Sequence, residues 1–234
     1  MKPRVIAVVQ ARMGSKRFPG KMMEVLGRHT ILEWVLRRTS RSETLDGVVL
    51  ATSSAPENRI LQELAEGLSI PTLCGSEHDV LSRFILAAEK HGADHVVRIC
   101  ADNPFVAPEE IDRLTRSYLD RLPDYAFNHI PRMGNMYPDG LGAEIFSSAL
   151  QRRMAASTIE TRHREHVTLY VWDHTSEFRI QTIPAPPEIA FPHVKLDVDT
   201  RDDLERLRRL LGGLDIDSPA VDIVKAYNIS GKGE

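Results

Sequence analysis

The sequence predicts an α/β fold built on a doubly wound, mostly parallel sheet with helices on both faces. In the first half of the chain, short apolar runs alternate four times with helical patterns, which is typical of parallel sheets. The first run, Val5–Val9, is rich in β-branched residues and contains no polar residue, as expected for a strand buried on both faces. We therefore expect a single domain over residues 1–234, with a small inserted lobe over residues 124–183.

Capping and turn residues set the boundaries of the elements in this first half. Thr30 suits a helix N-cap, and Pro56 and Pro108 suit the first turns of two later helices. Gly67 and Gly92 end helical patterns. The strands expected after the first are Val48–Ala51, Pro71–Cys74 and Val96–Cys100. The helix side chains expected to face the core are Ile31, Leu32, Val35, Leu36, Ile60, Leu61, Leu64, Ala65, Ile111, Leu114 and Leu119.

From about Asp124 the pattern changes to shorter strand-like runs among turns that contain proline and glycine. These runs, which belong to the expected lobe, are Tyr125–Asn128, Ala143–Phe146 and Phe178–Ile183. Val194–Val198 then predicts a core strand that returns to the first sheet. Thr200 and Asp203 predict a capping box at the start of a helix. The last residues, 228–234, are small and polar, and we expect them to fray.

Composition excludes several classes of protein. The formal net charge of −3 and the pI near 6.3 provide no overall basic field, so nonspecific nucleic-acid binding is not expected. Cys74 and Cys100 have no metal-ligand spacing, and their apolar surroundings predict buried free thiols in a reducing compartment. No run of about 18 apolar residues is present to span a bilayer, and no signal-like segment precedes the first strand. We expect a soluble, cytoplasmic protein without a membrane partner.

The strongest functional signal is the loop Gln10–Gly20, which follows the first predicted strand. It contains two glycines, a proline and the cations Arg12, Lys16 and Arg17, and Lys21 comes directly after it. Open α/β sheets bind ligands at the carboxyl ends of their strands, and Arg, Lys and glycine backbone suit a polyphosphate. Five residues separate the glycines and no hydroxyl residue follows Lys21, so the loop is not a P-loop. The alternative is a solvated basic turn.

Aspartates lie at the ends of two predicted strands. Asp102 follows Val96–Cys100, where a carboxylate could hold Mg²⁺, which prefers oxygen ligands and is usually held by one or two carboxylates together with substrate phosphates. Asp197 and Asp199 are two residues apart on a predicted strand, so their side chains share a face and could converge on one cation. The alternatives are ordinary turn chemistry for Asp102, which precedes Asn-Pro, and a helix-start role for Asp199.

Beyond these patterns, the loop QARMGSKRFPGK resembles the signature loop of the nucleotidyltransferases that activate sugars. Five further segments match the same family in the same order and, with the loop, cover most of the chain. They are CGSEHDVLSRF (74–84), VVRICADNPFV (96–106), YPDGLGAEIF (137–146), REHVT (164–168) and LDVDTRDDLERL (196–207). The sequence therefore resembles the acylneuraminate and 3-deoxy-manno-octulosonate cytidylyltransferase superfamily, in its spore coat polysaccharide biosynthesis protein F branch.

This resemblance implies a Rossmann-like nucleotidyltransferase fold and a magnesium-dependent reaction. CTP and a sugar acid, of nonulosonic or 3-deoxy-ulosonic type, would give a CMP-sugar and pyrophosphate for a surface polysaccharide or glycan. Such chemistry depends on positioning and charge neutralisation rather than on a Ser-His-Asp triad. Two alternatives remain: a sugar-1-phosphate guanylyl- or uridylyltransferase, and a non-catalytic nucleotide-binding protein of the same fold.

The loop, the aspartates and the resemblance together assign roles to individual residues. The expected catalytic residues are Arg12, Lys21, Asp102 and Asp199, and the expected ligands of Mg²⁺ are Asp102, Asp199 and Asp197. The expected nucleotide-binding residues are Gln10, Ala11, Arg12, Met13, Gly14, Ser15, Arg17, Lys21, Ala51, Thr52, Ser53, Gly75, Arg83 and Asp102. The resemblance places the base near residues 51–53, 75 and 83. It places the acceptor near Asn103, Asp139, Gly140, Glu144, Arg164, Glu165 and His166.

The resemblance also implies a homodimer, because members of the cytidylyl type often pair through the inserted lobe. In this lobe, a short stretch rich in proline and glycine contains several aromatic and large apolar residues, which are enriched at interfaces. They are Tyr125, Phe127, Ile130, Met133, Met136 and Tyr137. The alternative is that these side chains pack on their own sheet.

Overall fold

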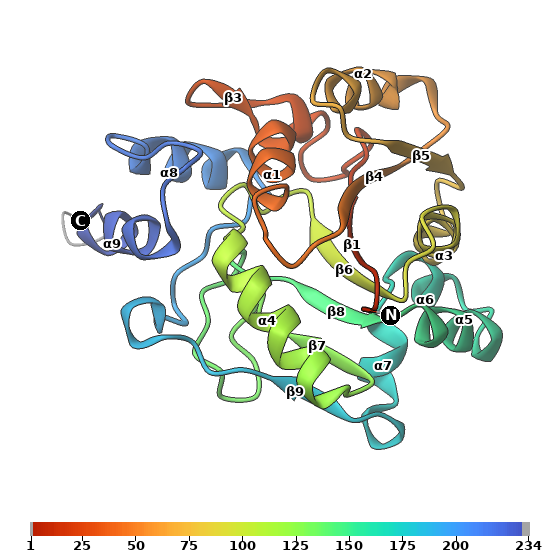
Figure 1. The fold of residues 1–234 in the computed structure, drawn as a ribbon. Coiled ribbons are helices and arrows are strands. Elements are labelled where there is room, and N and C mark those ends of the chain that lie inside the picture. Colours follow the sequence, from red (N-terminus) through yellow and green to blue (C-terminus); the bar gives the residue numbers. More distant parts are fainter. Residues whose placement is uncertain (1, 231–234) are drawn as a thin grey trace.

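The computed structural model describes residues 2–230, without the side chain of Ser230, and its centre is a seven-stranded sheet (Figure 1). The strands are β1 (Val5–Gln10), β4 (Gly47–Ser53), β5 (Thr72–Gly75), β6 (His95–Cys100), β7 (Tyr125–Phe127), β8 (Glu144–Ser147) and β9 (Ile180–Thr182). Their order in the sheet is β5-β4-β1-β6-β8-β7-β9. The four strands of the first half are parallel, and β8 joins them antiparallel to β6. The predicted fold class is confirmed.

Helices cover both faces of the sheet, and side chains of β1 alternate between two cores. Val5, Ala7 and Val9 belong to one core, and Ile6 and Val8 belong to the other. The helices of the first core are α1 (Ile31–Thr39), α2 (Arg59–Gly67), α4 (Pro108–Arg121), α8 (Arg201–Leu210) and α9 (Ala220–Ser230). Those on the opposite side are α3 (Val80–Lys90), α5 (Ser148–Ser157), α6 (Thr161–Glu165) and α7 (Leu169–Asp173). This two-sided burial explains why β1 has no polar residue before Gln10.

The remaining elements are short. Strands β2 (Val25–Leu26) and β3 (His29–Thr30) form a separate antiparallel pair. The 3₁₀ turns are η1 (Lys21–Met23), η2 (Pro56–Asn58), η3 (Thr175–Glu177) and η4 (Pro187–Ile189). Within residues 2–230, no helix has the length and apolar character needed to cross a membrane.

The predicted caps are present where the sequence places them. Thr30 accepts a hydrogen bond from the Glu33 N–H at 3.2 Å, and Thr200 and Asp203 form both halves of a capping box. Pro56, in contrast, opens η2 rather than α2 itself. The core face expected for α2 is also too wide, since Ile60 lies on the solvent side and is 44% exposed.

Two local expectations about the chain's surface and end need correction. Cys74 lies on the edge strand β5 and is exposed, whereas Cys100 is only partly exposed; both thiols are free. An edge strand has one face toward solvent, which explains the exposure of Cys74. Residues 228–230 belong to α9 rather than to a frayed end, and residues 231–234 lie outside the described part of the chain.

The expected core strand Val194–Val198 is wrong as a strand. This segment is extended and its apolar side chains are buried, but its one bridge is Lys195 with Asp139. The reason is that β8 already occupies the side of β6 where the segment would have to pair. The Val198 N–H instead donates to the Asp102 carbonyl at 2.8 Å, and this brings Asp199 to the end of β6.

Residues 124–183 contribute β7, β8 and β9 to the central sheet. The aromatic side chains of Tyr125, Phe127 and Tyr137 are fully buried, so they cannot form an interface as predicted. They fill the core instead, and Tyr125 and Phe127 stack at 5.8 Å between ring centroids. Met133 and Met136 are exposed, at 59% and 47%.

Candidate functional site

A cavity of about 450 Å³ opens at the carboxyl ends of β1 and β6, between the loop Gln10–Gly20 and the end of α6. Segments that are far apart in sequence meet there, as expected at this edge of an open α/β sheet. Its lining consists of Gln10, Ala11, Arg12, Ser15, Lys16, Arg17, Lys21, Met22, Arg98, Cys100, Ala101, Asp102, Glu165, His166 and Asp199. Predicted phosphate, metal and acceptor residues therefore share one cavity.

The loop after β1 is held in place by hydrogen bonds to its backbone. The Met13 N–H donates to Oδ1 of Asn58 at 2.8 Å, and Nδ2 of Asn58 donates to Oγ of Ser53 at 2.6 Å. The Met13 carbonyl accepts from the Ser15 and Gly20 N–H groups, and Gly20 has a φ of +77° that favours glycine. Asn58 and Ser53 thus fix the loop, so Ser53 serves the loop structurally.

Lys21 joins the loop to both predicted metal-site aspartates. Its Nζ donates to the Val198 carbonyl at 2.7 Å, to Asp102 at 2.9 Å and to Asp199 at 3.4 Å. The lysine side chain is only 8% exposed. One ammonium group therefore bridges two carboxylates and reduces the repulsion between them.

The arginines of the loop are also paired with carboxylates at the cavity. Arg17 lies 2.7 Å from Asp199. Arg12 lies 3.0 Å from Glu165 and 3.8 Å from Glu77, and its hydrogen bond holds the pKa of Glu165 below the usual value. An anionic ligand could replace the carboxylates as the partner of these arginines if a metal cation bound the carboxylates.

Asp102 and Asp199 fit a divalent cation, since both offer carboxylate oxygens within reach of one Lys21 ammonium group. Among residues 2–230, no group of three or more His, Cys, Asp or Glu side chains is arranged to hold a metal by itself. Asp197 does not line the cavity; its Oδ2 lies 3.4 Å from Nζ of Lys195, and burial raises its pKa. The geometry thus brings two of the three predicted ligands together.

The residues predicted to contact a base lie behind the loop, outside the lining of the cavity. Arg83 is buried and donates Nη1 to the carbonyls of Ser76 and Glu77, whereas its Nε and Nη2 have no partner in the described chain. The hydroxyl of Thr52 is likewise buried without a partner. Gly75 admits this arginine, because a Cβ there would lie 3.0 Å from Cγ of Arg83.

The predicted acceptor residues divide into two groups. Glu165 and His166 line the cavity. Glu144 is buried beneath it, and Arg164 pairs with Asp79 instead. Burial, and then the charge of nearby Asp197, raise the pKa of Asp139 to about 6. The other two predicted residues, Asn103 and Gly140, are buried beside the segment that precedes Asp199.

Sequence reasoning missed several residues of the site. Arg98 and Cys100 are two positions apart on β6, and both line the cavity. The signal that could have identified them is the charged residue within the apolar run VVRIC. Lys16 also lines the cavity. Asn58, which anchors the loop, carries no recognisable signal, because its role depends on the distant residue Met13.

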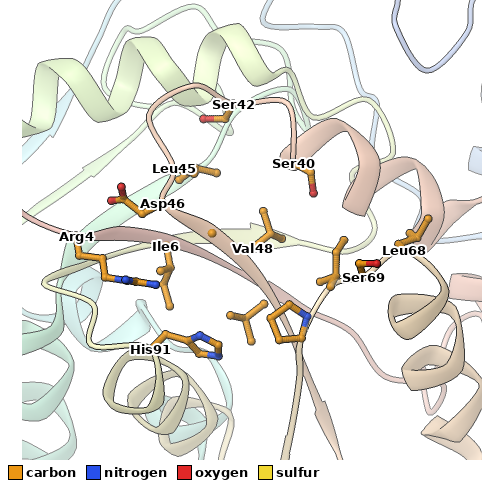
Figure 2. Close-up of a pocket in the computed structure, with 14 residues that line it drawn as sticks. Arg4, Ile6, Ser40, Ser42, Leu45, Asp46, Val48, Leu68, Ser69 and His91 are labelled. Atoms are coloured by element: carbon orange, nitrogen blue, oxygen red, sulfur yellow. The ribbon is translucent and has the colours of Figure 1, made fainter.

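A second cavity, of about 420 Å³, lies at the opposite edge of the sheet (Figure 2). Its labelled side chains come from around the start of β1 and β4, from the loop before β4 and from the residues that follow three helices; they include Arg4, Asp46 and His91. None of the residues that the sequence assigns to a site lines it. Similar volume alone therefore does not distinguish the two cavities.

Comparison with known proteins shows the family of the chain. The family model described as "Cytidylyltransferase" matches residues 6–217. The chain is 31% identical over 211 residues to "Spore coat polysaccharide biosynthesis protein SpsF" of Bacillus subtilis (strain 168), covering 88% of this chain and 85% of that protein. It is 32% identical over 117 residues to a 3-deoxy-manno-octulosonate cytidylyltransferase of Pelobacter propionicus, covering 50% of this chain and 45% of that protein.

A solved structure extends the agreement over the whole fold. It is the structure of a cytidylyltransferase from Leptospira borgpetersenii serovar Hardjo-bovis, which matches with a TM-score of 0.91 and 26% sequence identity. The match covers 98% of this chain and 96% of that chain. With the family model, the relatives and the fold in agreement, the chain belongs to the cytidylyltransferase family and is an enzyme of that family.

Proposed function

We propose that this enzyme is a magnesium-dependent cytidylyltransferase that converts CTP and a sugar acid to a CMP-sugar and pyrophosphate. The observation that carries the proposal is the contact of Lys21 with both Asp102 and Asp199. Phosphate-binding and metal-binding groups neutralise each other in the free protein. A metal and a triphosphate that arrive together can replace these partners with their own charges.

In the proposed reaction, an acceptor oxygen attacks the α-phosphorus in line and pyrophosphate leaves. Arg17 and Lys21 hold the β- and γ-phosphates, and Arg12 borders the same cavity. Asp102 and Asp199 would hold the metal, which when bound would neutralise charge on the α-phosphate. The carboxylates are released from Lys21 and Arg17 as these cations turn to phosphate, so the site stays close to charge balance.

Buried donors behind the loop support recognition of a base. Within residues 2–230, two nitrogens of Arg83 and the hydroxyl of Thr52 have no partner, and buried polar groups without partners are costly unless a ligand satisfies them. A base that carries acceptor atoms on its edge could do so.

The acceptor class rests on the relatives. The Pelobacter propionicus relative is named for 3-deoxy-manno-octulosonate, a sugar acid, and the Bacillus subtilis relative for polysaccharide biosynthesis. A sugar acid would enter beside Glu165 and His166, which line the same cavity as the proposed phosphate-binding cations. We expect the product to serve a surface polysaccharide or glycan and the enzyme to be cytoplasmic, which cell fractionation would check.

Pyrophosphate release tests the proposal. The protein is incubated with CTP, UTP or GTP, with and without Mg²⁺, across a panel of sugar acids and sugar 1-phosphates. We expect release only with CTP, a sugar acid and the metal together. Release with UTP or GTP and a sugar 1-phosphate would replace the proposed donor and acceptor, and no release under any condition would contradict enzymatic turnover on these substrates.

We also propose a homodimer. The buried aromatic residues cannot form its interface, so the contact would use the exposed methionines of the same segment. Met133 and Met136 are exposed in a loop with left-handed backbone at Met133, Gly134 and Met136, and they remain available for a contact between copies. Light scattering at micromolar concentration tests this. We expect the wild type to be a dimer and the double variant with Met133→Asp and Met136→Asp to be a monomer. A wild type that is monomeric throughout would exclude the proposed dimer.

A further inference from the structure

A buried glutamate lies under the cavity and holds one of its arginines. Glu144 faces Arg98 directly across β8 and β6, and its carboxylate is 2% exposed. Its Oε2 accepts a hydrogen bond from Nη1 of Arg98. Its Oε1 accepts from the Tyr125 hydroxyl at 2.5 Å and from the Thr168 hydroxyl at 2.8 Å. Three donors thus fix the carboxylate, and the carboxylate fixes the guanidinium.

Arg98 is the charged partner of Glu144, because the nearby imidazole of His129 is neutral. His129 lies 3.9 Å from Glu144, but burial, and then the charges of Arg98 and Arg132, lower the pKa of its imidazole to about 3. The imidazole is therefore neutral near pH 7 and does not compete with Arg98 for the carboxylate. A buried carboxylate needs a paired cation, so the ion pair is expected to persist when ligands bind.

Arg98 keeps donors that the protein does not use. Its side chain is 17% exposed and lines the cavity. Nη1 binds Glu144, Nε is buried without a partner, and Nη2 makes no hydrogen bond to another residue between 2 and 230. An arginine carries five N–H donors in a rigid fork, which suits a planar carboxylate. Glu144 thus holds the guanidinium through Nη1, and Nη2 is the nitrogen left for a ligand in the cavity.

Arg98 also differs from the other paired cations by position. Arg12, Arg17 and Lys21 come from the loop region after β1, and their carboxylate partners lie at the cavity. Arg98 comes from β6, next to β8, and its partner is sealed beneath it. The phosphates thus have cations of their own, and a separate cation remains on the acceptor side.

We propose that Arg98 recognises the carboxylate of the acceptor sugar acid and that Glu144 is the positioning residue that aims its guanidinium. This inference rests on the proposed function and deepens it. Arg98 then determines specificity, because a neutral sugar would leave its donors unpaired. The role that the sequence predicts for Glu144, direct acceptor contact, becomes an indirect one through Arg98.

The test compares a sugar acid with a neutral analogue. The probes are 3-deoxy-manno-octulosonate and its C1 amide, and the readout is kcat/KM from CTP-dependent pyrophosphate release. The variant combines Arg98→Gln with Glu144→Gln, because removing the arginine alone would leave a buried unpaired carboxylate. The two glutamines retain a neutral hydrogen-bonding pair of similar shape.

The expected result is a loss of acid-over-amide preference. The variant should lower kcat/KM for the acid about 10- to 100-fold, the range of a charge-assisted hydrogen bond, and that for the amide less than about threefold. The Kd for CTP should stay within about twofold. Equal losses for acid and amide, or no loss for the acid, would overturn the inference, because a structural role cannot distinguish the two probes.

Two further variants keep the test decisive. If the double variant does not fold, Arg98→Lys retains a cation against Glu144 without the fork and should still lose preference for the acid. Removing the matched surface pair Arg59 and Glu63, whose side chains are 81% and 59% exposed, should change nothing. If the wild type consumes CTP with neither this acid nor N-acetylneuraminate, the proposed sugar-acid acceptor fails and the inference with it.

Discussion

The two cavities at opposite edges of the sheet have similar volumes, about 450 and 420 Å³, but different chemistry. At the amino edge (Figure 2), Asp46 accepts the Val5 N–H at 2.8 Å, and Ser42 donates to Asp112 at 2.5 Å. These polar groups join chain segments. At the carboxyl edge, Lys21 and Arg17 pair with carboxylates that a metal could take over. Ion pairs that a ligand could replace, rather than cavity volume, therefore distinguish the cavity that we propose as the active site.

The largest expected difference between the edges concerns an aspartate at each. Asp102→Asn should lower kcat about 100-fold or more, because it removes the charge of a carboxylate that we propose as a metal ligand. Asp46→Asn should leave kcat unchanged, since an amide oxygen can still accept the Val5 N–H. Steady-state pyrophosphate release measures both, with circular dichroism to check folding. Wild-type magnesium-dependent turnover in folded Asp102→Asn would contradict the assignment.

A glycine at each edge gives the next comparison. Gly140 has a φ of +87°, and a Cβ there would lie 3.0 Å from the Asp197 nitrogen, so Gly140→Ala should destabilise the fold by about 1–3 kcal/mol. Gly47 lines the amino-edge cavity and has no atom near an added Cβ, so Gly47→Ala should change stability by less than about 1 kcal/mol. Urea unfolding measures both free energies. Equal effects of the two substitutions would mean that the close approach of Gly140 to the backbone of Asp197 does not help to position Asp199.

The fold was predictable because its signals are local. The apolar run Val5–Val9 and the caps at Thr30 and Thr200 depend on neighbouring residues, and all three were confirmed. Val194–Val198 was mispredicted, because its pattern is that of a buried strand while its place in the sheet is taken by β8. Periodicity indicates burial, but pairing depends on the order of distant strands.

The same distinction applies to the site. The cations of the loop and the aspartate after β6 could be predicted, since each follows an apolar strand whose carboxyl end faces the ligand edge. The support of Met13 by Asn58, and of Arg98 by Glu144, could not be predicted, because each joins residues 45 or 46 positions apart. Glu144 illustrates the consequence: its segment was identified, but its burial was not.

Loop cations offer a smaller, more selective effect. Lys21→Ala and Arg17→Ala should each weaken CTP binding about tenfold but CMP binding much less, because their proposed partners are the distal phosphates. Arg17 is 67% exposed, so its effect should be the smaller of the two. Arg4→Ala at the amino edge should alter neither. Calorimetric titration with both nucleotides decides the matter, and equal losses for CTP and CMP would indicate a structural role for the loop.

The last comparison concerns pH and a histidine near each cavity. Burial lowers the pKa of His129 to about 3, whereas an unfolded histidine titrates near 6.5. Above pH 6.5 neither state binds a proton; between about 6.5 and 3 only the unfolded chain does. Stability is therefore lost as pH falls through this window, by up to about 1.4 kcal/mol per pH unit.

His129→Gln removes this contribution. Its free energy of unfolding should consequently fall less steeply than that of the wild type between pH 6.5 and 4.5, as urea unfolding at a series of pH values would show. His91 lines the amino-edge cavity, and its pKa is also lowered by burial, but it is only partly buried and screened by solvent. His91→Gln should alter the slope little. If His91→Gln reduced the pH dependence of the free energy of unfolding as much as His129→Gln, the burial of His129 would not explain that dependence. His129 could then become charged in acid and give Glu144 a second cation.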